Sequence, residues 1–226
     1  MLLILMAVAG CAHRQDPQSF HRAAPSQPDA HEGVVVHKIM TPGSRGSAVR
    51  VGDTELWTCR HLLTQPVLLV DGLPTGYEIL EQGQGTSAQD DWAIISVDDE
   101  VLAPCGDLSY LEHDLQVIDG QEVWLKGYWS AGPLTHSQAI ALENSMVPAR
   151  VESPPRPIEA SDELIYVVAP SNETYLGGSG CATVGYLDDR QILLGMYVEA
   201  DTYLTLSGLH VRHLCRRWPV MHSDPR

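Results

Sequence analysis

The sequence has few basic residues and almost no phenylalanine. Its 226 residues include 14 Lys and Arg against 29 Asp and Glu, which gives a formal net charge of −15, and they include only 1 Phe. This charge argues against a nucleic-acid-binding protein and against electrostatic attachment to an anionic membrane, because both need clustered basic side chains. The apolar share of 44% is ordinary, so disorder along the whole chain is excluded.

The sequence also lacks an apolar run at its start that is long enough to span a membrane. Residues 1–10 are apolar, which is too short for a transmembrane helix but fits the core of a secretory signal. The ending Val8-Ala9-Gly10-Cys11 resembles the lipobox of bacterial lipoproteins, which implies that Cys11 is lipidated. No Lys or Arg precedes the run, so a start upstream of Met1, or a plain apolar terminus, stays open as an alternative. Residues 12–32 are polar and Pro-rich, and we expect a flexible tether.

Strand-like segments begin at Gly33. The 19 Gly and 15 Pro indicate many turns between short strands, which favours an all-β protein. We expect a first half at 33–103, a connector at 104–119 and a second half at 120–207. The strand candidates are 34–39, 48–51, 55–58, 66–70, 77–80, 90–97, 121–128, 138–142, 146–151, 164–168, 181–186 and 192–198.

The segment 208–218 differs from these candidates. Its apolar residues stand at 209, 211, 214, 215 and 218, a spacing that predicts an amphipathic helix ending at Pro219. Residues 219–226 are expected to form a tail. No comparable helix pattern and no repeat occurs earlier in the chain.

The stretch 175–185, Y-L-G-G-S-G-C-A-T-V-G, is the strongest candidate for a reactive site. A nucleophilic serine needs an exposed hydroxyl and free backbone N–H groups beside it, and the glycines around Ser179 allow both. A Gly-Ser-Gly run alone is weak evidence, because most such runs are turns. Here strand-like runs follow the loop directly, which favours a rigid site.

Two further motifs precede Ser179 in the chain. Trp57-Thr-Cys-Arg-His61-Leu-Leu resembles the Leu-Thr-Ala-x-His-Val-Val motif of the trypsin-like serine peptidases. Asp91-Trp-Ala-Ile-Ile-Ser-Val resembles their Asp-Leu-Ala-Leu-Leu-x-Val motif, and Gly177-Gly-Ser179-Gly-Cys-Ala resembles their Gly-x-Ser-Gly-Gly-Pro motif. Over roughly residues 33–217, the chain therefore resembles this chymotrypsin-fold family, most closely its compact bacterial branch that includes the Deg/HtrA proteins.

The resemblance implies an architecture and a set of roles. It implies two six-stranded antiparallel β-barrels with the site between them, Ser179 as nucleophile and His61 as general base. Asp91 would orient the imidazole, and the N–H groups of Gly177 and Ser179 would form the oxyanion hole. Asp90 is an alternative to Asp91, which we prefer because it directly precedes the apolar run. No metal or cofactor is required.

The chain departs from the family pattern around the expected site. Gly178 replaces an Asp of the digestive members, and Cys181-Ala182 replaces the usual Gly-Pro. Val198 stands where the family has a Ser that supports the triad Asp, which predicts reduced activity. The resemblance places Val198, Glu199 and Ala200 along the substrate, and Glu173 at the floor of the primary specificity pocket, although a solvent-facing Glu173 is the stronger interpretation.

The cysteines and late histidines leave alternatives open. With Cys11 lipidated, four of the 5 cysteines remain, and an exported protein would oxidise them. The resemblance suggests a Cys105–Cys215 disulfide, while Cys59 and Cys181, the latter beside the serine, would either pair or stay as buried thiols. The histidines His210 and His213, three residues apart, form a possible metal pair, but surface histidines are the better interpretation.

Together these features predict a serine endopeptidase that hydrolyses polypeptides through an acyl-enzyme, exported to the cell envelope of a bacterium. Its contact with the membrane would be a lipid on Cys11. The rival hypothesis is a weakly active pseudo-peptidase of the same fold that binds peptides, and an esterase is a third hypothesis. The natural substrate, the P1 preference and the oligomeric state are left open.

Overall fold

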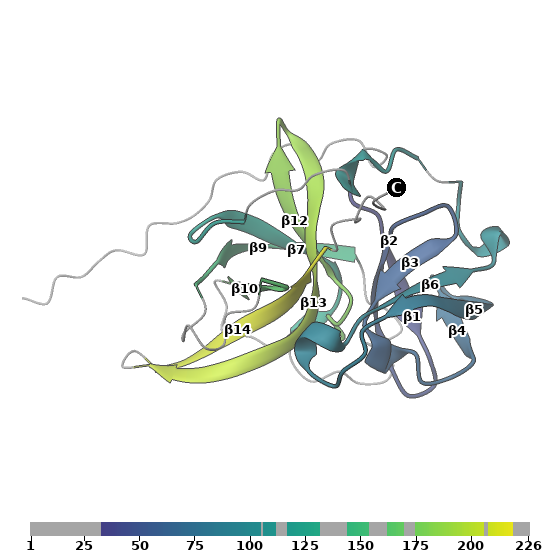
Figure 1. The fold of residues 1–226 in the computed structure, drawn as a ribbon, viewed down its shortest axis with the longest axis horizontal. Coiled ribbons are helices and arrows are strands. Elements are labelled where there is room, and N and C mark those ends of the chain that lie inside the picture. Colours follow the sequence, from purple (N-terminus) through teal and green to yellow (C-terminus); the bar gives the residue numbers. More distant parts are fainter. Residues whose placement is uncertain are drawn as a thin grey trace, which may run out of the picture.

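The computed structural model describes residues 33–104, 106–111, 117–131, 144–153, 162–169, 175–205 and 208–218. Over these residues the chain forms two closed antiparallel β-barrels that lie side by side (Figure 1). The predicted signal segment, tether, tail and the strand candidate at 138–142 lie outside the described residues. None of the described helices is both long and apolar enough to cross a membrane. The predicted all-β, two-barrel fold is confirmed.

The first barrel has the strand order β1-β2-β3-β6-β5-β4. Alternate residues of β6 are buried, the pattern expected of a strand with one face on a core. The hairpin predicted around Gly52 and Asp53 is formed, because β2 pairs with β3 directly across this turn. The bounds are β1 Val36–Met40, β2 Arg45–Arg50, β3 Glu55–Thr58, β4 Val67–Val70, β5 Leu73–Gln82 and β6 Ala93–Val97.

The second barrel has the order β10-β14-β13-β12-β7-β9. A separate two-stranded sheet joins β8 Ser130–Ala131 to β11 Tyr175–Leu176, just before the serine loop. Strands β13 and β14 form a long hairpin that projects beyond the barrel at the lower left of Figure 1. The bounds are β7 Glu122–Tyr128, β9 Asn144–Val151, β10 Leu164–Val168, β12 Ala182–Leu187, β13 Arg190–Thr205 and β14 Gly208–Arg217.

The predicted C-terminal helix is wrong, because residues 208–217 form strand β14 instead. Their apolar positions also fit a period of two once His213 is counted among the inward-facing residues. Val211, His213 and Cys215 are all buried. The 16-residue β13 offers β14 a partner along its whole length, and this pairing satisfies backbone groups that a helix would have bonded internally. Tertiary pairing therefore overrides the helical spacing.

The hydrophobic core of the first barrel extends into the second barrel, which also has a core cluster of its own. Buried residues of the second barrel, among them Val184, Met196 and Val198, belong to the same cluster as Leu56 and Trp57 of the first. At the end of β14, Trp218 packs edge-on against Trp57, with ring centroids 4.8 Å apart. Loops at the junction are therefore held by packing from both sides, which is the requirement for a rigid site.

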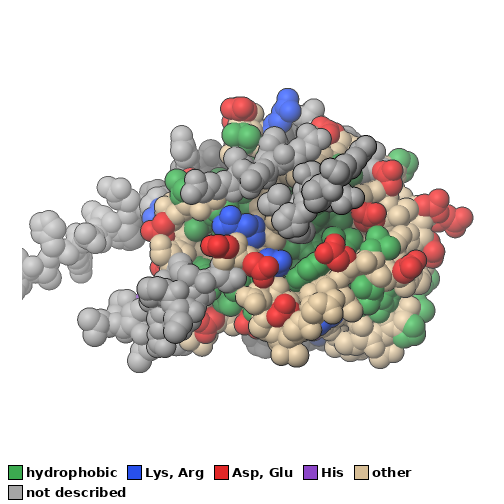
Figure 2. Space-filling view, in the orientation of Figure 1, with side chains coloured by type: hydrophobic (Ala, Val, Ile, Leu, Met, Phe, Trp, Pro, Cys, Tyr) green, Lys and Arg blue, Asp and Glu red, His purple; other side chains and the backbone are tan. Residues whose placement is uncertain are grey.

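The connector between the barrels is anchored to the first barrel. It contains a short 3-10 helix, η4 Ser109–Leu111, in which the buried Tyr110 donates a hydrogen bond to the carbonyl of Arg50 at 2.7 Å. On the outside, acidic side chains are spread over the face shown in Figure 2, with few basic ones between them. On this face the acidic side chains are thus spread out rather than gathered in one patch.

Candidate active site

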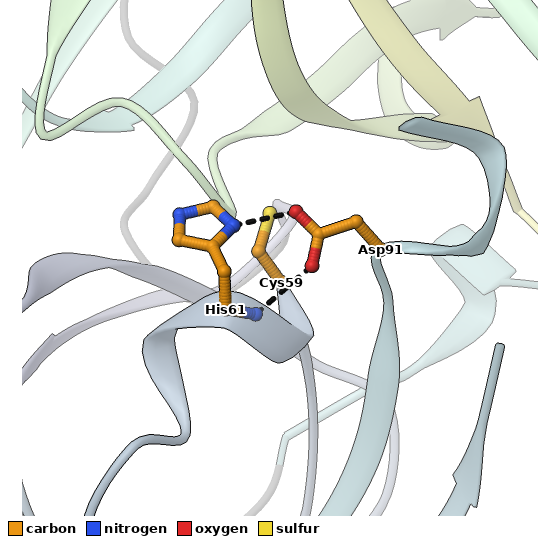
Figure 3. Close-up of side chains that lie close together, drawn as sticks. All are labelled: Cys59, His61 and Asp91. Carbon is orange, nitrogen blue, oxygen red and sulfur yellow. Dashed lines mark hydrogen bonds and ion pairs between the residues drawn. The ribbon is translucent and has the colours of Figure 1, made fainter. Parts of the chain in front are cut away.

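His61 and Asp91 come from two short 3-10 helices of the first barrel. His61 lies in η1 Arg60–Leu62 directly after β3, and Asp91 ends η2 Ala88–Asp90 just before β6. The Asp91 carboxylate accepts two hydrogen bonds from His61, from ring Nδ1 at 2.5 Å and from the backbone N–H at 2.9 Å (Figure 3). Because the carboxylate accepts at Nδ1, the neutral imidazole carries its proton there and presents Nε2 as a base.

The electrostatics of this pair favour an ionised aspartate. Burial raises the pKa of Asp91, but the hydrogen bonds from His61 and the charges of His61 and Arg60 outweigh it, so its pKa lies below the usual value. The neighbouring Asp90 faces a different group, since it accepts a hydrogen bond from the Ser87 hydroxyl at 2.5 Å. The structure therefore pairs Asp91, and not Asp90, with His61.

Arg60 fixes the loop that carries Asp91. Its guanidinium donates to the carbonyls of Gly83 and Gly85, which lie between β5 and η2. Sequence reasoning did not assign this residue a role, although its place directly before His61 is a usable signal. Arg60 thereby couples the position of the aspartate loop to the turn that bears the histidine.

Ser179 lies in a tight turn clamped between the barrels. Cys181 N–H donates to the Gly178 carbonyl at 2.9 Å across the turn, and Gly180 has φ +85°. A Cβ on Gly180 would lie 1.8 Å from the Ser47 carbonyl oxygen, so glycine is required there on both counts. On the first-barrel side, the Ser47 N–H of β2 donates to the Ser179 carbonyl at 2.8 Å.

Ser47 is a residue that sequence reasoning missed. Besides binding the Ser179 loop, its carbonyl accepts the Thr58 hydroxyl at 2.7 Å, and its own hydroxyl accepts the Tyr128 N–H at 2.9 Å. It therefore joins β2, β3, β7 and the serine loop. A serine within a strand gives no distinctive signal in the sequence, because its role depends on three partners distant in the chain.

A bulge in β13 holds the other side of the serine turn. The pairing register with β14 jumps between Tyr197 and Glu199, which leaves Val198 as the extra residue. The Tyr197 carbonyl accepts the Gly180 N–H at 2.8 Å, and the Val198 carbonyl accepts the Ser179 hydroxyl at 3.4 Å. The Val198 side chain is buried in the core cluster that extends from the first barrel.

The bulge and the serine turn also meet the histidine segment. Cys59, two residues before His61, donates its thiol hydrogen to the same Tyr197 carbonyl at 3.4 Å. The segments that carry Ser179 and His61 are thus both bonded, through Gly180 and Cys59, to the Tyr197 carbonyl at the junction of the two barrels. Within the described residues, the Ser179 hydroxyl bonds to Val198 and forms no hydrogen bond to His61.

A pocket of about 330 Å³ opens over the histidine–aspartate pair. Besides His61 and Asp91, it is lined by Arg60, Thr86, Ser87, Ala88 and Glu199. Of the predicted substrate-binding residues, Glu199 is exposed and lines this pocket. Val198 is buried, Ala200 is half-buried in β13, and neither lines the pocket. Glu173 lies outside the described residues. A larger hollow of about 610 Å³, lined by Asp90 and Arg216 among others, includes neither His61 nor Ser179.

The described cysteines are free thiols. Cys59, Cys181 and Cys215 are all buried, and none of them is in a disulfide. Of the two alternatives for Cys59 and Cys181, the buried thiols are therefore the ones formed, and the implied Cys105–Cys215 disulfide is not formed. Cys105 itself, like Cys11, lies outside the described residues. Burial raises the pKa of Cys181 and of Cys215 to about 12 and that of Cys59 well above its ordinary value. Protonated thiols of this kind are not nucleophiles at neutral pH.

The late histidines are not a surface pair. His213 is fully buried in the second barrel, contrary to expectation, and burial lowers its pKa to about 4. His210 stacks on Tyr203 of the neighbouring strand. Because successive side chains of a strand alternate between faces, residues three apart point to opposite sides of β14. This geometry removes the possible metal pair.

Comparison with known proteins supports the architecture. No family model matches the sequence, and no curated protein sequence matches it. Its structure is similar to the inactive form of the Rv3671c protease from M. tuberculosis H37Rv, with 15% identity, a TM-score of 0.52 and coverage of 83% of this chain and 85% of that chain.

Two further solved structures are similar. The MamO protease domain from Magnetospirillum magneticum has 14% identity and a TM-score of 0.52, and the match covers 83% of this chain and 94% of that one. A mutant of human heparin binding protein (CAP37) has 11% identity and a TM-score of 0.53, with coverage of 80% and 85%. At such identities the likeness concerns the fold alone, and the closeness to the Deg/HtrA branch stays a prediction. With its two closed six-stranded barrels, the chain has the fold of the chymotrypsin-like serine proteases.

Proposed function

We propose that the protein is a serine endopeptidase that cleaves polypeptides through an acyl-enzyme formed on Ser179. The observation that carries this proposal is the double hydrogen bond from His61 to Asp91. A carboxylate that holds both the ring and the backbone of a histidine fixes the ring orientation and the tautomer that a general base needs.

The proposed reaction begins at Ser179. The Ser179 hydroxyl turns from the Val198 carbonyl towards Nε2 of His61, gives up its proton and attacks the substrate carbonyl carbon. The imidazolium that forms is stabilised by the ionised Asp91, and the same proton then passes to the leaving amine. The N–H groups of Gly177 and Ser179 would stabilise the oxyanion, at about 3 kcal/mol per donor. A water molecule then hydrolyses the acyl-enzyme: His61 takes the proton of the water and returns it to the Ser179 oxygen.

The second candidate function is peptide binding without efficient catalysis. It is favoured by the Ser179 hydroxyl bonding to the Val198 carbonyl at 3.4 Å, which must be given up before catalysis. Val198 also offers no side-chain hydroxyl to Asp91. The similar fold of the human heparin binding protein, by its name a binding protein, is compatible with such a role.

One experiment separates the two functions. The 226-residue chain and its Ser179→Ala variant are incubated with a fluorophosphonate probe and weighed by intact-mass spectrometry. An endopeptidase gives a single adduct that is absent from the variant, after which a peptide library would define its substrates. A folded wild-type chain that gains no adduct refutes the endopeptidase and leaves the binding protein.

We further propose that the protein is exported and anchored in the cell envelope by a lipid on Cys11. The support for this is the Val8-Ala9-Gly10-Cys11 ending of the apolar run. Mass spectrometry of the N-terminal peptide from a bacterial membrane fraction tests it. A lipid-modified cysteine at the new N-terminus is the expected result, and an unprocessed peptide beginning at Met1 would contradict it.

A further inference from the structure

Three metal-ligating side chains of different chemistry meet at the histidine–aspartate pair. A sulfur from Cys59, a ring nitrogen from His61 and a carboxylate oxygen from Asp91 all lie within 4.8 Å of one another (Figure 3). We propose that they form a binding site for a thiophilic divalent cation, Zn²⁺ or Cd²⁺, and that an ion bound there switches off the base. Binding itself is independent of the proposed endopeptidase function, whereas the inhibition rests on it.

The donor set matches this class of ion. Zinc takes thiolate, imidazole and carboxylate ligands in tetrahedral geometry, and sites with three protein ligands complete the shell with water. At bond lengths of about 2.0 to 2.3 Å, the ligand atoms of a tetrahedral site lie about 3.3 to 3.6 Å apart. The three atoms therefore need to move by about 1 Å or less to enclose the ion, chiefly by opening the His61–Asp91 hydrogen bond of 2.5 Å.

The surroundings permit this movement. The side chains of His61 and Asp91 are 46% and 21% exposed and line the pocket of about 330 Å³, so the ring and the carboxylate can separate and a water can enter. Cys59 is fully buried at the end of β3 and provides the fixed ligand. Its present partner is the Tyr197 carbonyl at 3.4 Å, a long sulfur hydrogen bond that a metal–thiolate bond can replace.

The site depends on Cys59 in particular. The other described cysteines, Cys181 and Cys215, do not belong to this cluster of ligand atoms. Cys181 instead contacts the hydroxyl of Ser47 at 3.4 Å. An alanine in place of Cys59, as in the family motif that the segment resembles, would leave only the imidazole and carboxylate.

Metal binding changes the imidazole tautomer. The Cys59 thiol loses its proton to solvent as its sulfur bonds the ion. The ion takes the lone pair of His61 Nδ1, whose proton leaves to solvent, and a proton from solvent binds at Nε2. In sum, one proton is released for each ion bound. Nε2 then carries a hydrogen and has no lone pair to accept the Ser179 proton, so the base is lost while the serine is untouched.

Binding is tested without any measurement of activity. The full chain is titrated with Cd²⁺ while the ultraviolet thiolate-to-Cd²⁺ charge-transfer absorption is recorded, for wild type and for Cys59→Ala, Cys59→Ser, Cys181→Ala and Cys215→Ala. Each fold is checked by circular dichroism. The chain has 5 cysteines, so the comparison between variants assigns the site. We expect the tightest absorption step to be lost in both Cys59 variants and kept in the two controls.

The effect on the base is tested with the fluorophosphonate probe. The labelling rate of each variant with Cd²⁺ or Zn²⁺ is divided by its own rate without metal. The wild type should lose labelling and recover it with a chelator, at a metal concentration at least about 10-fold below that needed for either Cys59 variant. Equal sensitivity of wild type and Cys59 variants would overturn the inference, as would a Cd²⁺ step that survives in both.

Failure of the proposed function gives a different pattern. A wild-type chain that takes up no probe without metal refutes the endopeptidase, and the absorption titration then still decides the metal site by itself. Labelling that proceeds undiminished while the Cys59-dependent Cd²⁺ step is saturated would show that the ion binds without disabling the base, which overturns the switch.

Discussion

Replacement of Asp91 by Asn tests the central geometry of the site. The carboxylate accepts from the His61 backbone N–H and from ring Nδ1, whereas a carboxamide has only one oxygen to offer. With that oxygen on the backbone N–H, the amide NH₂ faces Nδ1 and donates to it, which forces the proton onto Nε2. The ring keeps its position but loses its function as a base.

The size of the effect follows from the lost charge. Opposite unit charges 2.5 Å apart attract by about 7 kcal/mol at an effective dielectric constant of about 20. The two side chains are 46% and 21% exposed, so solvent screens this attraction, and about 7 kcal/mol, or about 10⁵ in rate, is its upper limit. A wrong imidazole tautomer in a Ser-His-Asp triad costs about 10⁴ in rate, which lies below this limit.

The assay is the rate of fluorophosphonate adduct formation on wild type, Asp91→Asn and the matched control Asp90→Asn. The control removes a neighbouring carboxylate that bonds to Ser87 and not to His61. We expect labelling of Asp91→Asn to fall by about 10⁴-fold and labelling of Asp90→Asn to stay within about 3-fold of wild type. A folded Asp91→Asn chain that labels at the wild-type rate would refute the reasoning, and a loss confined to Asp90→Asn would show that the neighbouring acid was the partner.

Three further predictions concern the serine turn, a buried histidine and the pocket. Gly180→Ala should lower the free energy of unfolding by about 2 kcal/mol or more in urea unfolding, because φ is +85° and the new Cβ would meet the Ser47 carbonyl. The control Gly76→Ala, with open space around it, should change this free energy by less than about 0.5 kcal/mol. Equal effects of the two substitutions would contradict the tight packing of the serine turn against Ser47. Burial lowers the pKa of His213 from 6.5 to about 4, so between these values the unfolded chain binds the extra proton and stability falls with falling pH, by about 1.4 kcal/mol per pH unit. His213→Gln should flatten the pH dependence of unfolding in this window, and an unchanged slope would assign it to another group. Glu199→Gln should reduce cleavage of library peptides with Lys or Arg facing the pocket by about 2- to 5-fold relative to uncharged peptides. Glu78→Gln, on the exposed face of β5, is the control for a general loss of surface charge. The same loss in both variants would refute a direct contact between Glu199 and the peptide.

Much of the candidate site could be predicted from local patterns. The segments around His61, Asp91 and Ser179 each combine a polar residue with an adjoining apolar run, and the structure gathers all three at the junction of the barrels. The preference for Asp91 over Asp90 also follows from its place directly before the apolar run that forms β6, from which only Trp92 separates it. These features are short-range, so the sequence carries them directly.

Other parts of the site depend on partners far away in the chain. Ser47 bonds to residues of β3, β7 and the serine loop, and nothing in its own segment distinguishes it from an ordinary strand serine. The bulge that turns the Val198 carbonyl towards Ser179 exists only because β13 and β14 shift register there. The state of the cysteines likewise depends on distances across the fold, which leave Cys59, Cys181 and Cys215 as thiols.

The sequence by itself determined that the chain is all-β, where most of its strands lie and which three side chains are candidates for catalysis, because alternation and turn residues act over a few positions. Only the tertiary structure decided that residues 208–217 form a strand and not a helix. The spacing of their apolar residues suits both a helix and a strand. The strand forms because β13 offers a full-length partner for the backbone hydrogen bonds, and because the barrel interior buries Val211, His213 and Cys215 on one face.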